Sequence, residues 1–294
     1  MTPRPLTSKV PLVLLLGYGI GFASVALGPG LVFDDHPGQI HRLAHVLTVG
    51  AAPWRWNPGW WAGYAELQFY PPGFSYLGAV VHRAGLGAMS IEQAYRAALW
   101  IAYLLPGVAT QLLLGRVLRD SWLALPWAFL ALTLSAGSRS GVEEGVRWGL
   151  VAARLGWGLL PLLALSLVRW VEGAPRISRA TAPLLAAIVL VHPTHAPAAI
   201  CLLAGAAVWA KGPIAGRARA ATRAVALGLG LAAFWLLPFL VHHHMALPLA
   251  WGDGSPAALG LQIWQQPLLV LLVAASAGAL VAHARLRAAT PAAV

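Results

Sequence analysis

The sequence predicts an all-α membrane protein with about eight transmembrane helices and with juxtamembrane helices in a long first outer loop. Three observations predict this class. Hydrophobic residues make up 59% of the 294 residues and charged residues only 10%, whereas soluble domains carry roughly 25% charged residues. Apolar runs long enough to cross a bilayer recur along the chain. Basic residues gather in the short loops on one side of these runs, as is typical of cytoplasmic loops.

The apolar runs predict most of the crossings directly. The runs of sufficient length are residues 11–29, 94–114, 121–136, 156–171, 196–210, 224–241 and 267–284. Residues 30–92 form the first outer loop in this scheme. Within it, residues 70–87 are expected to lie along the outer face, because a crossing there would move Arg116 and Arg119 away from the cytoplasm. We therefore expect a juxtamembrane helix in this segment.

Residues 181–210 are expected to form a hairpin of two short helices. One helix of this length would be about 45 Å long, more than the bilayer core of about 30 Å. Pro193 and Pro197 also interrupt it. The hairpin tip, His192-Pro193-Thr194-His195, is expected within the membrane depth or lining a wet cavity, because irregular backbone is not tolerated against lipid.

This topology places both termini in the cytoplasm and the whole net charge of +11 on the cytoplasmic side. The outer side then holds seven basic and seven acidic residues and nine of the ten histidines. We expect a single multi-pass domain, residues 1–294, in the inner (plasma) membrane, with residues 246–294 forming an outer loop and the last helix. Topology accounts for the charge, so no nucleic-acid partner is expected. The single cysteine, Cys201, excludes a disulfide framework.

Candidate chemistry begins at Asp34 and Asp35, directly after the first apolar run. Neighbouring carboxylates near low dielectric repel each other and persist where a cation, hydrogen-bond donors or water compensate them. We expect one of them at the floor of the largest outward-facing cavity, as a catalytic base or a metal ligand. The alternative is structural: Asp35 caps the next helix, Pro37 occupies its first turn, and Asp34 is solvated.

The segment Gly38–Val49 is expected to form an amphipathic helix with Ile40, Leu43 and Leu47 on its apolar stripe. His41 and His45 are four residues apart and share a face. His36, His41 and Arg42 are candidate substrate-binding residues because they lie close to the Asp pair in sequence.

Aromatic residues follow in the same loop, with four tryptophans and a tyrosine between Trp54 and Tyr64. They favour either an interfacial aromatic belt or a stacking platform for sugar rings or a lipid head group. Tyr70 begins the entry into the juxtamembrane helix. In the second outer loop, Arg139 is a candidate for holding phosphate, and Glu143 or Glu144 for holding a metal or a hydroxyl.

Histidines provide the remaining candidates. His192 and His195 at the hairpin tip are candidates for lining the cavity, with a satisfied buried histidine as the alternative. Three consecutive histidines, residues 242–244, cannot all point at one ion from a helix. The sequence contains no P-loop, nucleotide-binding glycine fingerprint, zinc-protease motif or serine nucleophile elbow. These absences disfavour a nucleotide-driven pump and a soluble-type hydrolase.

Taken together, the motifs of residues 10–245 resemble those of GT-C integral-membrane glycosyltransferases. The order is one membrane helix, the Asp pair with a downstream His, Trp-x-Pro, Gly-Tyr, Tyr-Pro-Pro-Gly, a Ser-Arg second loop and a His-Pro hairpin tip. More narrowly, the chain resembles bacterial membrane proteins labelled as 6-pyruvoyl-tetrahydropterin-synthase-related, a label that describes a hydrophobic membrane domain.

The resemblance implies a GT-C-like fold and a polyprenyl-phosphate sugar as donor, used on the outer face beside membrane lipid. It places the catalytic carboxylate on Asp34 or Asp35 and the second acidic position on Glu143 or Glu144. No cofactor is required; a divalent metal held by outer carboxylates is an alternative source of positive charge, as are Arg42 and Arg139. Two other functions stay open, a transporter or flippase of a lipid-linked substrate and a non-catalytic protein that retains the fold.

Overall fold

The computed structural model describes residues 9–26, 31–32, 34–59, 62–134 and 141–245. The chain divides into two units, Met1–His244 and Met245–Val294, and the described elements belong almost entirely to the first. The predicted last helix, residues 267–284, and the candidate residue Arg139 lie outside the described residues. The described elements are helices apart from one short β ladder, which confirms the all-α class.

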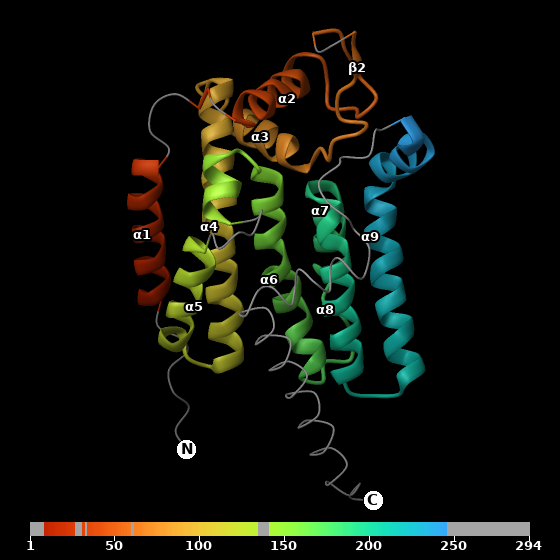
Figure 1. Ribbon diagram of the computed structural model, residues 1–294. Coiled ribbons are helices and arrows are strands. Elements are labelled where there is room, and N and C mark those ends of the chain that lie inside the picture. Colours follow the sequence, from red (N-terminus) through yellow and green to blue (C-terminus); the bar gives the residue numbers. More distant parts are fainter. Residues whose placement is uncertain (1–8, 27–30, 33, 60–61, 135–140, 246–294) are drawn as a thin grey trace, which may run out of the picture. The chain divides into compact units, whose positions relative to one another are not determined.

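Seven of the described helices form a bundle (Figure 1). They are α1 (Val10–Ala26), α4 (Ile91–Leu118), α5 (Ser121–Thr133), α6 (Val151–Val171), α7 (Thr181–Val191), α8 (Ala196–Trp209) and α9 (Ile214–His242). Helix α4 contacts α1, α5 and α6, and helix α7 contacts α6 and α9. Short 3-10 turns follow α7 and α9, at Pro193–His195 and His243–Met245.

Three of the described helices are long and apolar enough to cross a membrane: Ile91–Leu118, Val151–Val171 and Ile214–Met245. A crossing requires about 20 predominantly apolar residues, so these three helices indicate a membrane protein. Four further apolar helical segments within the described residues are shorter, at 10–17 residues. The number of eight crossings therefore stays a prediction.

Side-chain caps fix the N-terminal ends of α4 and α5. Ser90 Oγ accepts a hydrogen bond from the Gln93 N–H at 3.1 Å, and the Ser90 N–H donates to Gln93 Oε1 at 2.7 Å, which forms a capping box. Asp120 Oδ1 accepts from the Trp122 N–H at 2.8 Å. Between the two helices, Arg119 adopts the left-handed conformation, with φ of 55°. The chain therefore reverses direction within two residues.

The predicted break within residues 181–210 is confirmed, because α7 and α8 are separate helices joined by a 3-10 turn. Thr181 at the start of α7 lies beside Ser166 of α6, with their hydroxyl oxygens 2.9 Å apart. His195 in the turn lies beside the other end of α6, with Nε2 3.1 Å from the Ala153 carbonyl oxygen. Helix α7 therefore runs antiparallel to α6, and the chain turns back at the tip.

Helices α2 (His36–Thr48) and α3 (Gly73–Ala84) lie together at one end of the bundle, as Figure 1 shows. The antiparallel ladder of β1 (Trp56–Asn57) and β2 (Tyr64–Ala65) lies at the same end. We name it the outer end, after the predicted orientation, and the opposite end the inner end. Helix α3 has 12 residues and is about 18 Å long, too short for a bilayer core of about 30 Å. This agrees with the predicted juxtamembrane placement.

The buried face of α2 differs from the predicted stripe. Ile40 and Leu47 are only half-buried, whereas Gln39 and Val46 are buried, and so is His36. The predicted stripe is correct for Leu43, which is buried, and Ile40 and Leu47 pack against the core. It misses the burial of His36 and Gln39 because it counted apolar residues only. The Tyr95 hydroxyl bonds to His36, and the Tyr70 hydroxyl accepts a hydrogen bond from Gln39. Polar side chains with such partners can be buried.

Arg154 lies between the predicted crossings 121–136 and 156–171, so the sequence places it in the second outer loop, and this placement is wrong. It lies in α6 and is completely buried. Its Nη2 donates to the carbonyls of Leu132 and Ala131 in the last turn of α5, at 2.7 and 3.2 Å, where helical carbonyls lack partners of their own. Gly145 packs against the aliphatic part of the Arg154 side chain, since a Cβ at Gly145 would be 2.5 Å from the Cβ of Arg154. One buried cation thus joins α5, α6 and the segment before α6.

The predicted orientation can be tested with single cysteines and a membrane-impermeant thiol reagent. In a Cys201→Ala background, Leu86→Cys, at a residue that is 92% exposed at the outer end, should react in intact cells. Ala180→Cys at the inner end should react only after the membrane is opened, because the basic end is expected to face the cytoplasm. The opposite labelling pattern would invert the topology.

Candidate functional site

Asp34 and Asp35 lie between α1 and α2 in the chain, and both are exposed. Asp34 has a left-handed backbone, with φ of 50°, which Asp tolerates better than most residues. Asp35 occupies the N-cap position of α2, with Pro37 in the first turn, but its side chain makes no capping hydrogen bond. The catalytic role of the pair stays a prediction.

Backbone hydrogen bonds join the Asp pair to the second outer segment. The Asp35 N–H donates to the Trp148 carbonyl at 3.1 Å, and His36 Nε2 lies 3.1 Å from the Arg147 carbonyl oxygen. Gly149 allows this close approach, because a Cβ there would lie 2.8 Å from the His36 nitrogen, and its φ is +84°. Only glycine adopts that conformation without a side chain in the way.

His36 is completely buried next to the exposed pair. Its Nδ1 lies 2.6 Å from the Tyr95 hydroxyl oxygen at the start of α4. A neutral ring can donate from Nε2 to the Arg147 carbonyl and accept from Tyr95 at Nδ1. Burial lowers the pKa of His36, and the Arg147 carbonyl and the carboxylates of Asp34 and Asp35 oppose this effect.

The second-loop candidates lie on η1, a π-helical turn over Glu143–Arg147. Glu143 is exposed, and its carboxylate pairs with the Arg147 guanidinium at 3.2 Å. Glu144 is buried and is close enough to Arg154 for electrostatic attraction. Glu143 and Arg147 therefore reach solvent beside the Asp pair, whereas Glu144 faces the bundle. Turns of this kind are frequent at functional sites.

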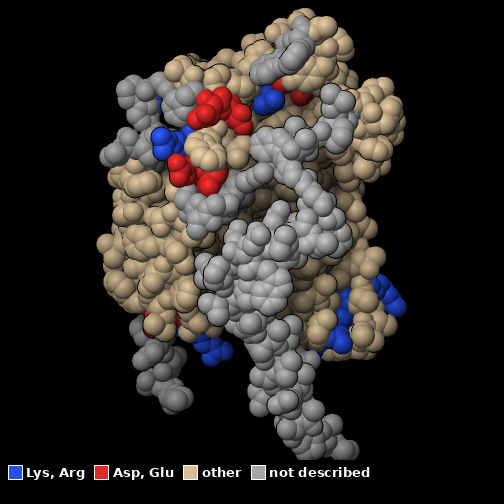
Figure 2. Space-filling view, viewed as in Figure 1, with Lys and Arg blue, Asp and Glu red and all other residues tan. Residues whose placement is uncertain are grey.

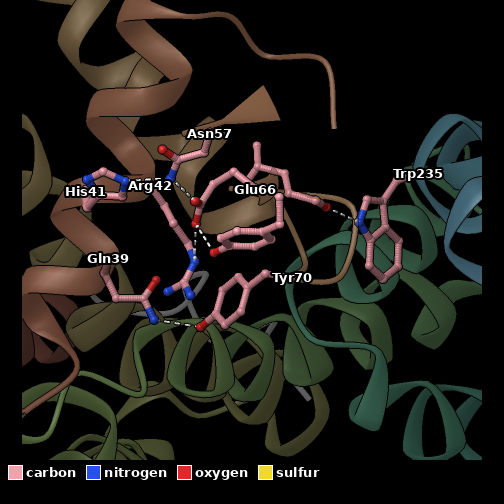
Figure 3. Close-up of polar contacts among 9 residues, drawn as sticks. Gln39, His41, Arg42, Asn57, Glu66, Tyr70 and Trp235 are labelled. Carbon is pink, nitrogen blue, oxygen red and sulfur yellow. Dashed lines mark hydrogen bonds and ion pairs between the residues drawn. The ribbon is translucent and has the colours of Figure 1, made fainter. Parts of the chain in front are cut away.

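A second polar cluster surrounds Glu66, which is completely buried (Figure 3). Its Oε1 lies 3.2 Å from Arg42 Nε and accepts a hydrogen bond from the Tyr64 hydroxyl at 2.9 Å. Its Oε2 accepts from the Asn57 amide. Donors from α2, β1 and β2 thus compensate the buried charge, as a buried carboxylate requires.

Three of the predicted substrate-binding residues of the first loop, His41, Arg42 and Tyr70, belong to this Glu66 cluster, whereas His36 lies beside the Asp pair. The Arg42 guanidinium lies 3.8 Å from the centre of the Tyr70 ring, a cation–π contact. Gln39 Nε2 donates to the Tyr70 hydroxyl at 2.6 Å, and His41 Nε2 lies 2.8 Å from Asn57 Nδ2. Figure 3 shows these side chains converging from α2 and the loop. Their contact with a substrate stays a prediction.

Burial shifts the titration of two residues near Glu66. Burial, and next the hydrogen bond and charge of Glu66, raise the pKa of Tyr64 to about 12, with Arg42 opposing the shift. Tyr64 therefore stays a donor at neutral pH. Burial also lowers the pKa of His45, against the attraction of Glu66.

The first outer loop is attached to the bundle at two points. The Trp235 indole of α9, completely buried, donates to the Leu67 carbonyl at 2.8 Å. Gly73 at the start of α3 lies on the end of α7, since a Cβ there would be 2.6 Å from Val191 Cγ2 and 2.9 Å from the Leu190 carbonyl. The Glu66 cluster is therefore held over helices distant in sequence.

The hairpin tip lies against α6. The rings of His192 and His195 have centroids 5.0 Å apart, and Gly156 faces both, with its ideal Cβ 3.0 Å from His195 Cδ2. The adjacent Val191 touches Gly73, so the tip lies beside the first outer loop, as expected. A role for the two histidines in substrate binding stays a prediction.

The described tryptophans of the first loop do not decide between the two interpretations of the aromatic stretch. Trp54 and Trp56 are each more than half exposed, and Trp60 and Trp61 lie outside the described residues. Gly63, with φ of +92°, makes room for the Trp56 indole. The sugar-stacking platform stays a prediction.

The structure brings most of the sequence-predicted residues into three groups: the Asp pair with His36 and Glu143; the Glu66 cluster; and the hairpin tip. Glu144 is buried and faces the bundle instead, and Arg147, which joins the first group, was not predicted. Sequence reasoning missed Glu66, Asn57, Tyr64 and Gln39 as members of a site. The register of β1 with β2, Asn57 opposite Tyr64, brings Asn57 and Tyr64 together beside Glu66, and Gln39 joins them from α2 through Tyr70. A two-residue ladder leaves no periodic signal in the sequence.

This fold and these groups define a helical membrane protein with its candidate site residues at the outer end of its bundle. No protein-family profile, curated protein or solved structure matches the chain. Among the described residues, no group of three or more His, Cys, Asp or Glu side chains lies close enough to hold a metal ion.

Removal of the Glu66 carboxylate should destabilise the protein strongly. Glu66→Ala leaves Arg42 and Asn57 buried without their partner, which costs about 3–5 kcal/mol of unfolding free energy. The matched control is Glu92→Ala, which removes an exposed ion pair with Arg96 and should cost about 1 kcal/mol or less. Denaturant unfolding in detergent micelles measures both. Equal losses of unfolding free energy in Glu66→Ala and Glu92→Ala would show that the Glu66 contacts do not stabilise the outer end.

His36 should make stability fall in mild acid. Because the pKa of His36 in the folded protein lies below 6.5, the unfolded chain takes up the proton first as the pH falls. This contribution is complete above pH 6.5 and is lost as the pH falls toward the folded-state pKa. His36→Gln should therefore reduce the drop in unfolding temperature between pH 7.5 and 5.5. His82→Gln on α3 serves as the control, and an equal effect of both variants would contradict the assignment.

Proposed function

We propose that this chain is a membrane-embedded glycosyltransferase that moves a sugar from a polyprenyl-phosphate donor to an acceptor at the outer end. One observation carries the proposal. The exposed Asp34 and Asp35 lie beside η1, which carries the exposed Glu143 and Arg147, because the Asp35 N–H bonds to the Trp148 carbonyl and the His36 ring to the Arg147 carbonyl. Carboxylates and a guanidinium are thus gathered at the outer end of the bundle, where a lipid-linked substrate would present its phosphate.

The chemistry assigns a separate role to each charge. One Asp carboxylate takes the proton from the acceptor hydroxyl as its oxygen forms a bond to the anomeric carbon. The bond from that carbon to the phosphate oxygen breaks, and the electron pair leaves with the polyprenyl phosphate. Developing positive charge on the sugar is stabilised by the second carboxylate. Arg147 stabilises the negative charge on the departing phosphate.

His36 supports this arrangement without entering the reaction. Its ring connects the Tyr95 hydroxyl to the Arg147 carbonyl, so it sets the distance between the Asp pair and η1. Arg42, Tyr70 and the hairpin histidines lie farther along the same end, where they would contact the sugar or acceptor. No step of the proposal passes through a metal ion.

The Asp pair can be tested by charge removal without loss of volume. Asp34→Asn or Asp35→Asn should leave the protein folded and inserted but lower transfer by about 10²–10⁴-fold at the position of the base. The assay follows a labelled sugar from polyprenyl phosphate to product in membranes that contain the full chain.

Asp120→Asn is the matched control, because it makes the same change at the inner end and Asn caps a helix as well as Asp does. It should retain transfer. Near-normal transfer by both Asp34→Asn and Asp35→Asn would show that neither residue is the base. Movement of the labelled lipid across the bilayer without product would favour the transporter instead.

A further inference from the structure

The inner end of the bundle carries a basic surface with few acidic residues. Its cations, which we call the inner basic face, are Arg116, Arg119, Arg169, Arg176, Arg179, Lys211, Arg217, Arg219 and Arg223. In this part of the described chain the acidic residues are Asp120 and Glu172. Figure 2 shows basic side chains at this end, while most of the visible acidic side chains lie toward the outer end.

Both acidic residues of this end are already engaged. Asp120 accepts the backbone N–H groups that begin α5. Glu172 pairs with Arg116 across the ends of α4 and α6. Arg217 is also engaged, since its Nη1 donates to the Ala207 and Val208 carbonyls at the end of α8, at 2.8 and 2.6 Å. The other cations of this face therefore have little negative charge from the described chain to offset them.

Two turns of the inner end come together. The Lys211 side chain, from the connection between α8 and α9, lies over Gly173 in the connection between α6 and α7. An ideal Cβ at Gly173 would be 3.1 Å from Lys211 Cδ and 3.7 Å from Nζ, and Gly173 has φ of +113°. Arg176 and Arg179 follow on the same connection and are exposed. The α6–α7 connection, with Arg176 and Arg179, and the α8–α9 connection, with Lys211, therefore lie side by side.

The position of these turns along the bundle identifies the partner. Helices α4 and α6 end at this face and α9 begins at it, and all three are long and apolar enough to span a membrane. Cations at the ends of spanning helices lie at the depth of the lipid head groups. Basic pockets between such helices match the phosphates of anionic lipids, and like charges without counter-ions repel.

We propose that the connections α6–α7 and α8–α9 bind the head group of an anionic phospholipid, with Arg176, Arg179 and Lys211 as its main contacts. The lipid phosphate supplies the negative charge that the described chain lacks at this end. The proposal concerns the end opposite the candidate site, so it does not depend on sugar transfer.

Lipid binding to the purified full chain tests the proposal. In detergent micelles, fluorescent phosphatidylglycerol should bind and phosphatidylcholine should not, and the binding should weaken as salt rises. The variant Arg176→Gln/Arg179→Gln/Lys211→Gln should bind phosphatidylglycerol about tenfold more weakly or worse. The double variant Arg176→Gln/Arg179→Gln, which keeps the Lys211 chain over Gly173, should show a partial loss.

A matched triple variant at the outer end, Arg55→Gln/Arg83→Gln/Arg96→Gln, removes the same number of charges and should bind as the unaltered chain does. Unfolding temperatures in phosphatidylcholine micelles establish that all variants are folded. Equal affinity for the two lipids would overturn the proposal. Unchanged binding by the inner triple variant, or equal loss in the outer one, would overturn it as well.

Discussion

The buried Glu66 carboxylate is the constraint on which the outer end depends. A carboxylate without water is tolerated only when several donors reach it. Here the donors come from Arg42 on α2, Asn57 on β1 and Tyr64 on β2. The three elements must therefore be in place together before Glu66 can be buried. Because Arg42 also covers the Tyr70 ring, the same contacts hold the chain that leads into α3.

A second buried charge links the bundle to the candidate site. Arg154 donates to the carbonyls at the end of α5, and its aliphatic side-chain atoms pack against Gly145 of η1. The Arg147 carbonyl at the end of η1 then lies at hydrogen-bond distance from the His36 ring, and the Trp148 carbonyl accepts the Asp35 N–H. The position of the Asp pair thus depends on packing inside the bundle. This explains how two exposed carboxylates can have a fixed place although their own side chains contribute little to it.

The sequence was sufficient where a local pattern has one physical solution. Two prolines in an apolar stretch longer than one crossing needs predicted the break between α7 and α8, because irregular backbone is not tolerated against lipid. Charge bias predicted the short helix α3.

Sequence alone determined that this chain is an α-helical membrane protein. It could not determine which charges are buried. Arg154 looked like a loop residue and Glu66 like one outer acid among several, because burial of a charge depends on donors from distant segments. Only the tertiary structure brings the carbonyls of α5 to Arg154 and brings Asn57 and Tyr64 to Glu66. The free energy of burying a charge is set by those partners, and they leave no pattern near the charged residue itself.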